Sequence, residues 1–211
     1  MTKILAIADE VDEAMYTGKL ERLRPDLVVS AGDLPFDYLE YIVSRLNVPL
    51  VYVPGNHDPE LRSPDPTWAP LGAERPLPGP QGCENVDGRV VVAAGLRIAG
   101  LGGSMRYKPG SNQYSDAEMR WRALSLEVRV KLNPSRRARK VDVLLTHSPP
   151  LGWGQDDLAH RGFSAFVRLV KDLEPKVLVH GHVHPFGRTK PERLLGTTQI
   201  INAVSSRLLE I

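Results

Sequence analysis

Five short apolar runs in this chain are each followed, directly or after a short turn, by an Asp, Asn or His. The runs cover residues 4–8, 27–29, 50–53, 143–145 and 177–179. Continuous Val, Ile and Leu runs of this length are typical of strands buried on both faces of a largely parallel sheet. Because open α/β sheets bind ligands at the carboxyl ends of their strands, we expect the polar residues to cluster at one sheet edge. Oxygen and nitrogen side chains gathered there predict a metal site and hydrolytic chemistry.

Length, charge and cysteine content narrow the class of protein. A chain of 211 residues can bury a sizeable core, and we expect residues 1–211 to form a single domain. The formal net charge of +2 gives no strong field for nucleic acid or a membrane surface. Cys83 is the only cysteine, which excludes an internal disulfide and a cysteine-based zinc site. Since no apolar stretch is long enough to span a bilayer, we expect a soluble, cytoplasmic protein.

The segments between the runs predict an alternation of strands and helices. Pro25 ends a short helix that precedes residue 27, and Pro35 suits the first turn of a second helix. Further predictions are a hairpin over residues 89–101, an amphipathic helix over 162–175 and closing antiparallel strands after residue 193. The proline-rich segment 58–81 is expected to be an ordered surface loop near the site.

The segment after residue 114 can be interpreted in two ways. Ser115-Asp116-Ala117-Glu118 is a capping-box sequence, which predicts the start of a helix. Apolar residues at 124, 126, 128, 130 and 132 also alternate as they would in a strand. We favour the helix because the cap and the flanking charges agree. One face of this helix would then carry Ala117, Trp121, Leu124 and Val128.

The polar residues after the runs form an ordered set of motifs. They are Asp9, Gly32-Asp33, Gly55-Asn56-His57-Asp58, His147 and Gly181-His182-Val183-His184. In this order they resemble the calcineurin-like metallophosphoesterase family, whose pattern is Asp-x-His, Gly-Asp, Gly-Asn-His-(Asp/Glu), a later His and Gly-His-x-His. Each motif alone is weak. The third and the last together, each after a predicted strand, are specific, and the motifs extend over most of the chain.

The resemblance implies a fold and a metal centre. The fold would be the family's α/β architecture, a four-layer α/β/β/α sandwich of two mixed sheets flanked by helices. Two divalent ions would bind, and ligands of this mixed type suit Mn²⁺, Fe, Zn²⁺ or Ni²⁺. By resemblance, Asp33 bridges the ions, Asp9 and His184 bind the first, and His57 is the catalytic residue that donates to the phosphate or leaving group. The second ion would be bound by Asn56, His147 and His182.

The activity implied is hydrolysis of a small phosphoester, by in-line attack of a metal-bound hydroxide. A phosphodiester is preferred to a phosphomonoester because no large cap domain is evident. No long basic surface for nucleic acid is evident either. Arg106, in a glycine-rich segment, and His160 are candidate substrate contacts, with solvated surface residues as the alternative. The alternative function is a non-catalytic or weakly catalytic scaffold or binding protein on the same fold.

The chain departs from the family pattern at Val11, where the family has a histidine ligand. The first metal site is therefore expected to be weak. Glu10, Asp12 or Glu13 could replace the lost ligand, or could be solvated acids at a helix start. Two roles also remain open for Asp58, which could orient His57 or cap the next turn; Asp37 is a second candidate to orient His57.

Overall fold

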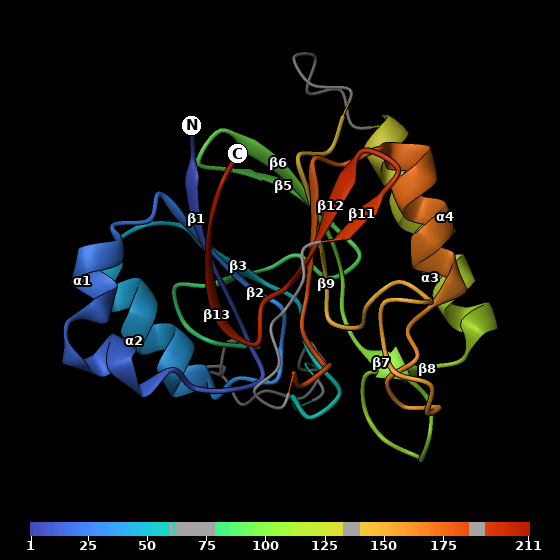
Figure 1. Ribbon diagram of the computed structural model, residues 1–211, viewed down its shortest axis with the longest axis horizontal. Helices are drawn as coiled ribbons and strands as arrows, with labels where there is room; N and C mark the ends of the chain where they lie inside the picture. Colours follow the sequence, from blue (N-terminus) through green and yellow to red (C-terminus); the bar gives the residue numbers. More distant parts are fainter. Residues whose placement is uncertain (60, 62–78, 133–139, 186–192) are drawn as a thin grey trace, which may run out of the picture.

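The five apolar runs form strands, and the strands divide between two sheets. In the computed structural model of the protein, which describes residues 1–59, 61, 79–132, 140–185 and 193–211, two packed sheets lie between two layers of helices (Figure 1). The first sheet contains β1 (Lys3–Ala8), β2 (Leu27–Ser30) and β3 (Leu50–Tyr52). The second contains β9 (Val143–Thr146) and β10 (Val177–His180).

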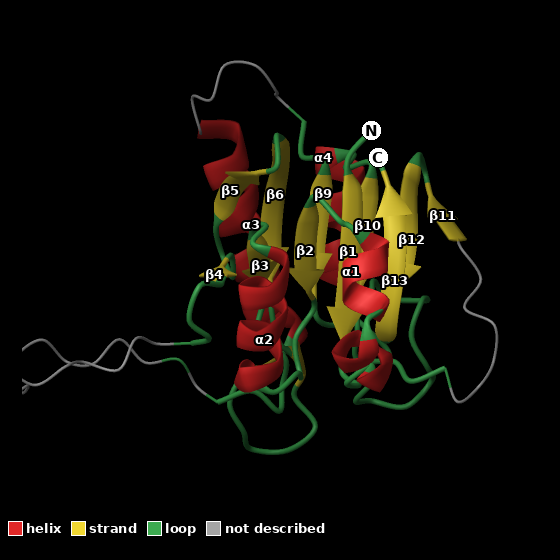
Figure 2. Cartoon of the chain, turned by 90° about the vertical axis from the view of Figure 1, so that its left-hand side faces the viewer, coloured by secondary structure: helices red, strands yellow, loops and turns green. Residues whose placement is uncertain are grey.

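The first sheet has the order β13-β1-β2-β3-β4. Its inner strands are parallel, β4 (Glu84–Asn85) adds a short parallel edge, and β13 (Ser205–Glu210) runs antiparallel to β1. The helices η1 (Glu13–Thr17), α1 (Lys19–Leu23) and α2 (Phe36–Leu46) lie beside this sheet (Figure 2). Apolar side chains from these helices pack with outer-face residues of β1 and β2 such as Leu5 and Val28.

The second sheet has the order β11-β12-β10-β9-β6-β5. Its remaining strands are β5 (Val90–Ala93), β6 (Leu96–Leu101), β11 (Arg193–Leu195) and β12 (Thr198–Asn202). The four inner strands are parallel, with β5 and β11 antiparallel at the edges. The helices α3 (Asp116–Leu132) and α4 (Ser164–Leu173) cover its outer face. A separate pair, β7 (Ser104–Met105) and β8 (Gln113–Tyr114), lies beyond β6.

The main core lies between the two sheets. Side chains such as Ile4 and Val29 of the first sheet pack against Ile98, Val143 and Val179 of the second, and all five are fully buried. The predicted four-layer α/β/β/α sandwich is therefore confirmed. Among the described residues, none of the helices combines the length and the apolar character needed to cross a bilayer.

Three sequence expectations need correction or limitation. The polar residues were expected at one sheet edge, but the strands that carry them belong to two sheets. Among the closing strands, β11 and β12 are antiparallel to each other and β13 is antiparallel to β1, as expected, but β12 also pairs in parallel with β10. Residues 60 and 62–78 of the proline-rich segment lie outside the described residues.

The predicted helix after Ser115 is confirmed, with its capping box formed. The Ser115 N–H donates to the Glu118 carboxylate at 2.7 Å, and the Glu118 N–H donates to the Ser115 hydroxyl at 3.3 Å. The face that packs on the sheet carries Met119, Ala123, Leu126 and Val130. The face named from the sequence, with Trp121 and Val128, points to solvent. The strand-like alternation of residues 124–132 places apolar side chains on both faces of this helix, so the pattern alone did not select the buried one.

Candidate metal centre

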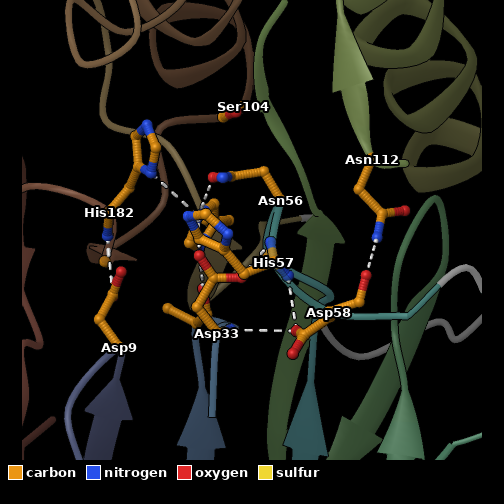
Figure 3. A network of polar contacts seen from close by, with 12 residues as sticks. Asp9, Asp33, Asn56, His57, Asp58, Ser104, Asn112 and His182 are labelled. Atoms are coloured by element: carbon orange, nitrogen blue, oxygen red, sulfur yellow. Dashed lines mark hydrogen bonds and ion pairs between the residues drawn. The ribbon is translucent and has the colours of Figure 1, made fainter. Parts of the chain in front are cut away.

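Residues from both sheets converge where their parallel strands end (Figure 3). Asp9, Asp33 and Asn56 follow β1, β2 and β3, whereas His147 and His182 follow β9 and β10. The candidate ligand atoms of Asp9, Asp33, His147 and His182 all lie within 4.8 Å of one another. The site therefore spans the junction between the two sheets, because each sheet ends its parallel strands on the same side.

The turns that carry these residues are unusually tight. Asp9, Asp33 and His182 have positive φ angles of 60°, 57° and 65°, a conformation that costs energy for residues other than glycine. A Cβ atom at Gly55 would lie 2.0 Å from Asp33 Oδ1, and one at Gly181 would lie 2.3 Å from Asp9 Oδ2. Both glycines are needed because the carboxylates occupy the space that a side chain would take.

Hydrogen bonds fix which ring nitrogen of each histidine faces the cluster. His147 Nδ1 lies 2.7 Å from the Ala31 carbonyl oxygen, and His182 Nε2 lies 2.9 Å from the Ala159 carbonyl oxygen. A carbonyl only accepts, so these nitrogens carry the protons. His147 Nε2 and His182 Nδ1 then point at each other, 3.2 Å apart. In neutral rings both would present lone pairs.

Two side-chain oxygen atoms lie close to the facing nitrogens. His147 Nε2 lies 3.0 Å from Asn56 Oδ1 and 3.3 Å from Asp33 Oδ2. Asn56 is 7 % exposed, and its amide nitrogen is buried without a hydrogen-bond partner among the described residues. Four acceptor atoms around one point are stabilised by a positive charge there, which the His147 proton or a bound cation would supply. Carbonyl partners on the far side of ligating imidazoles are also the usual environment of metal-bound histidine.

Without a metal ion, the proton on His147 offsets the negative charge of the carboxylates in the cluster. Burial alone would lower the pKa of His147, but the Asp33 carboxylate beside it raises that pKa to about 9. Burial acts to raise the pKa of Asp33, yet the charge of His147 outweighs it and lowers that pKa. Burial lowers the pKa of His182 to about 3 and raises that of Asp9 to about 6. A divalent cation would thus displace the His147 proton.

Asp58 supports the turns that hold these ligands. Its Oδ2 atom accepts from the Gly55 N–H at 2.7 Å and from the Asp33 N–H at 3.0 Å, and burial raises its pKa. The described contacts of its carboxylate are thus with the turns that precede it, and the two roles left open by the sequence stay predictions. Asp37 accepts from the Tyr38 N–H of its own helix. His57 has an exposed side chain, and its backbone N–H donates to Asp33 Oδ1 at 2.7 Å.

Val11 and the three acids near it, which could replace the missing ligand, contact different parts of the protein. Val11 packs against the apolar cluster of the first helical layer. Asp12 accepts from the Ala14 N–H and pairs with Lys19, and Glu13 is an exposed residue at the start of η1. Glu10 Oε1 lies 2.7 Å from His184 Nδ1. Among the contacts of the described residues, Glu10 is thus the acid of the three that reaches a predicted ligand.

The two predicted substrate contacts have different environments. The His160 ring lies against His182, with ring centroids 4.9 Å apart, and its Nδ1 is 2.8 Å from Asp157 Oδ1. The Arg106 guanidinium binds the Glu118 carboxylate at 2.8 and 3.0 Å, so its charge is already compensated. The loop of residues 151–163 therefore borders the cluster through Ala159 and His160.

Several groups that shape the site were not found by sequence reasoning. The carbonyl oxygens of Ala31 and Ala159 orient the two histidine rings, but backbone groups leave no signal in residue types. The Glu10 contact to His184 was one of three options, and only the path of the turn after β1 distinguishes them.

Comparison with known proteins agrees with this geometry. Residues 4–186 match the profile of the calcineurin-like phosphoesterase family. A search of curated proteins finds no match. One crystal structure, 19 % identical, has a TM-score of 0.62 over 96 % of this chain and 90 % of its own.

Two further solved structures share the fold at lower identity. TT1561 of Thermus thermophilus is 18 % identical, with a TM-score of 0.58 over 96 % of this chain and 88 % of its own. GAP50, the anchor in the inner membrane complex of Plasmodium, is 13 % identical, with a TM-score of 0.52 over 95 % and 70 %. The family match covers most of the sequence, and the chain belongs to the calcineurin-like phosphoesterase family.

Proposed function

We propose that this protein is a metal-dependent phosphoester hydrolase with a two-ion centre. One observation carries the proposal: His147 Nε2, His182 Nδ1, Asn56 Oδ1 and Asp33 Oδ2 converge while the remaining histidine protons are donated to carbonyls. Such a donor set fits a borderline divalent ion such as Mn²⁺, Fe²⁺, Zn²⁺ or Ni²⁺. Membership of the phosphoesterase family supports the reaction class.

The chain's residues would divide between two ions. Asn56, His147 and His182 would hold one, Asp9 and His184 the other, and Asp33 would serve both. Glu10 would assist His184, either by orienting its ring or by adding a carboxylate at the position that Val11 leaves without a ligand. When bound, a pair of divalent ions neutralises the phosphoryl oxygens and makes water acidic enough to supply a nucleophile near neutral pH.

Other residues would act on the substrate itself. The exposed imidazole of His57 is proposed to donate a hydrogen bond to the phosphate and a proton to the leaving oxygen. The His57 backbone N–H donates to Asp33, and this hydrogen bond fixes the position of the His57 Cα atom relative to the metal ligands. His160, stacked on His182, is the proposed contact at the rim of the site. Arg106 is less suited because Glu118 engages it.

Phosphodiesters are the proposed substrates. Within the described residues, no second domain stands over the carboxyl ends of the strands. This openness leaves room for a phosphate with two substituents.

The proposal is tested by removing metal from the protein with a chelator, adding back a single ion and measuring hydrolysis. With added Mn²⁺ we expect turnover of bis-p-nitrophenyl phosphate, faster than that of p-nitrophenyl phosphate. The Asp33→Ala variant should lose both activity and bound metal. A scaffold function, as in the anchor protein GAP50, would be favoured if wild-type protein bound metal without hydrolysing either ester in the presence of any of the four candidate ions.

A further inference from the structure

The outer surface of α3 carries an apolar row that the monomer leaves exposed. Trp121 and Leu132 are 71 % and 75 % exposed, and Val128 and Leu124 are 46 % and 38 % exposed. The row, completed by Ala117, is called the α3 seam below. At 3.6 residues per turn, it lies roughly opposite the buried face with Met119, Ala123, Leu126 and Val130. A contiguous apolar surface of this kind on a soluble domain marks an interaction site.

The α3 seam has the spacing of a helix-pairing surface. Ala117, Trp121, Leu124 and Val128 follow one another at intervals of four, three and four residues, which is the pattern of a coiled-coil contact. A groove of about 350 Å³ runs beside them, lined by Ala117, Arg120, Trp121, Leu124 and Arg168. A side chain from a second helix could insert there as a knob between the two arginine stems.

The α3 seam is complementary to the seam of a second copy when the two helices run antiparallel. Ala117 and Leu132 are equidistant from a point between Leu124 and Ser125, and so are Trp121 and Val128. A two-fold axis at that point would place each large side chain of the row opposite a smaller one. Such an isologous contact is the commonest way for identical chains to pair.

Charge at the helix ends favours the same arrangement. The first turn of α3 carries Asp116 and Glu118, which pair with Arg161 and Arg106, and the last turn carries Arg129 and Lys131, which contact the Gly88 carbonyl and Glu127. These contacts lie within one copy, so charge bears on the direction of the pair more than on its strength. In an antiparallel pair, the acidic end of each helix would lie beside the basic end of the other. A parallel pair would instead bring like charges together at both ends, which is destabilising.

We propose that the α3 seam binds a second copy of this chain, as an antiparallel two-fold dimer. The helix has 17 residues and is about 25 Å long. An interface formed mainly by one such helix from each copy falls at the small end of specific interfaces, below about 1,200 Å² in total. The dimer should therefore be concentration-dependent, with a dissociation constant in the micromolar range.

Sedimentation velocity of the full chain, over a series up to about 100 µM, tests the dimer. We expect the mass to rise from one to two chains across the series. Trp121→Glu, at a site remote from the metal ligands, should raise the dissociation constant at least tenfold. Its circular dichroism spectrum and thermal midpoint should match those of wild type at concentrations where both are monomeric. Val92→Glu is the matched control, because Val92 is also a large exposed apolar residue, at 62 %, but lies on β5; it should dimerise like wild type.

Cross-linking tests the direction of the pair. In a Cys83→Ser background, Ala117→Cys chains mixed with Leu132→Cys chains should form disulfide-linked heterodimers, and neither variant alone should cross-link. Self-cross-linking of Leu132→Cys would overturn the antiparallel arrangement. A wild-type chain that stays monomeric at about 100 µM, or a Trp121→Glu variant that dimerises like wild type, would overturn the proposal itself.

Discussion

At the scale of single residues, a variant at His57 distinguishes loss of catalysis from loss of metal binding. Its ring is exposed, and only its backbone N–H contacts a ligand, Asp33. His57→Ala should therefore keep the metal content of wild type while lowering kcat by roughly 10²–10³ through loss of a proton donor. Metal analysis and turnover of bis-p-nitrophenyl phosphate, measured on the same preparation, check both halves. Loss of metal together with activity would make His57 a ligand instead.

Glu10 and Val11 give a second pair of single-residue tests. Glu10 contacts His184, whereas Val11 packs into the apolar cluster of the first helical layer. Glu10→Gln should raise the Mn²⁺ concentration for half-maximal activity about tenfold, the loss typical of residues that support metal ligands. Val11→His should leave that concentration unchanged or destabilise the fold, because the new imidazole would have to leave an apolar contact. Tighter Mn²⁺ activation by Val11→His would show that position 11 does reach the ions.

At the scale of secondary-structure elements, the turns after β2 and β3 depend on each other through Asp58. Its carboxylate accepts from one backbone N–H in each turn. Asp58→Ala leaves one buried and one partly buried backbone donor unpaired, so we expect the free energy of unfolding to fall by about 2–4 kcal/mol and metal affinity to fall 10- to 100-fold. Chemical denaturation and metal titration check the two effects. Asp37→Ala is the control, since the exposed Asp37 accepts from the adjacent Tyr38 N–H within its own helix; an equal effect there would remove the special role of Asp58.

The elements themselves were largely predictable from the sequence. The apolar runs, Pro25 after one helix, Pro35 at the start of another and the capping box at Ser115 are local signals, and each corresponds to an observed element. The division of the runs between two sheets was not predictable from these signals, because strand pairing is decided by packing between distant segments. The buried face of α3 was also undetermined, since its apolar residues occupy both sides. Likewise, the hydrogen bonds from backbone carbonyls that orient His147 and His182 have no counterpart in residue type.

At the scale of the whole molecule, the cluster joins the two sheets. Asp9, Asp33 and Asn56 belong to one sheet and His147 and His182 to the other, so an ion bound by both sets would act as a cross-link. Metal binding should raise Tm, because a ligand that binds only the folded state stabilises it; at 100 times Kd the gain is about 2.7 kcal/mol. The gain should depend on pH, since bound metal must displace the His147 proton.

The metal-free protein should lose stability between pH 6.5 and pH 9. The folded-state pKa of His147 is about 9 and its ordinary value is 6.5, so the stabilisation is complete below 6.5 and is lost as pH rises through 9. Asp9 and His182, with folded-state pKa values of about 6 and about 3, change only below that window. A fall in Tm of about 5–10 °C is expected in chelator, and saturating Mn²⁺ should abolish it. His147→Gln should show no such fall; an equal fall in that variant would assign it to another group.

The location of bound metal is the most direct test of the centre. Crystals grown with Mn²⁺ should give anomalous-difference peaks at the junction of the two sheets, the stronger one among Asp33, Asn56, His147 and His182. A second, weaker peak is expected beside Asp9, Asp33 and His184, because that site has lost its family histidine. A map with no peak between the two sheets, or with its strongest peak away from His147 and His182, would contradict the proposed metal centre.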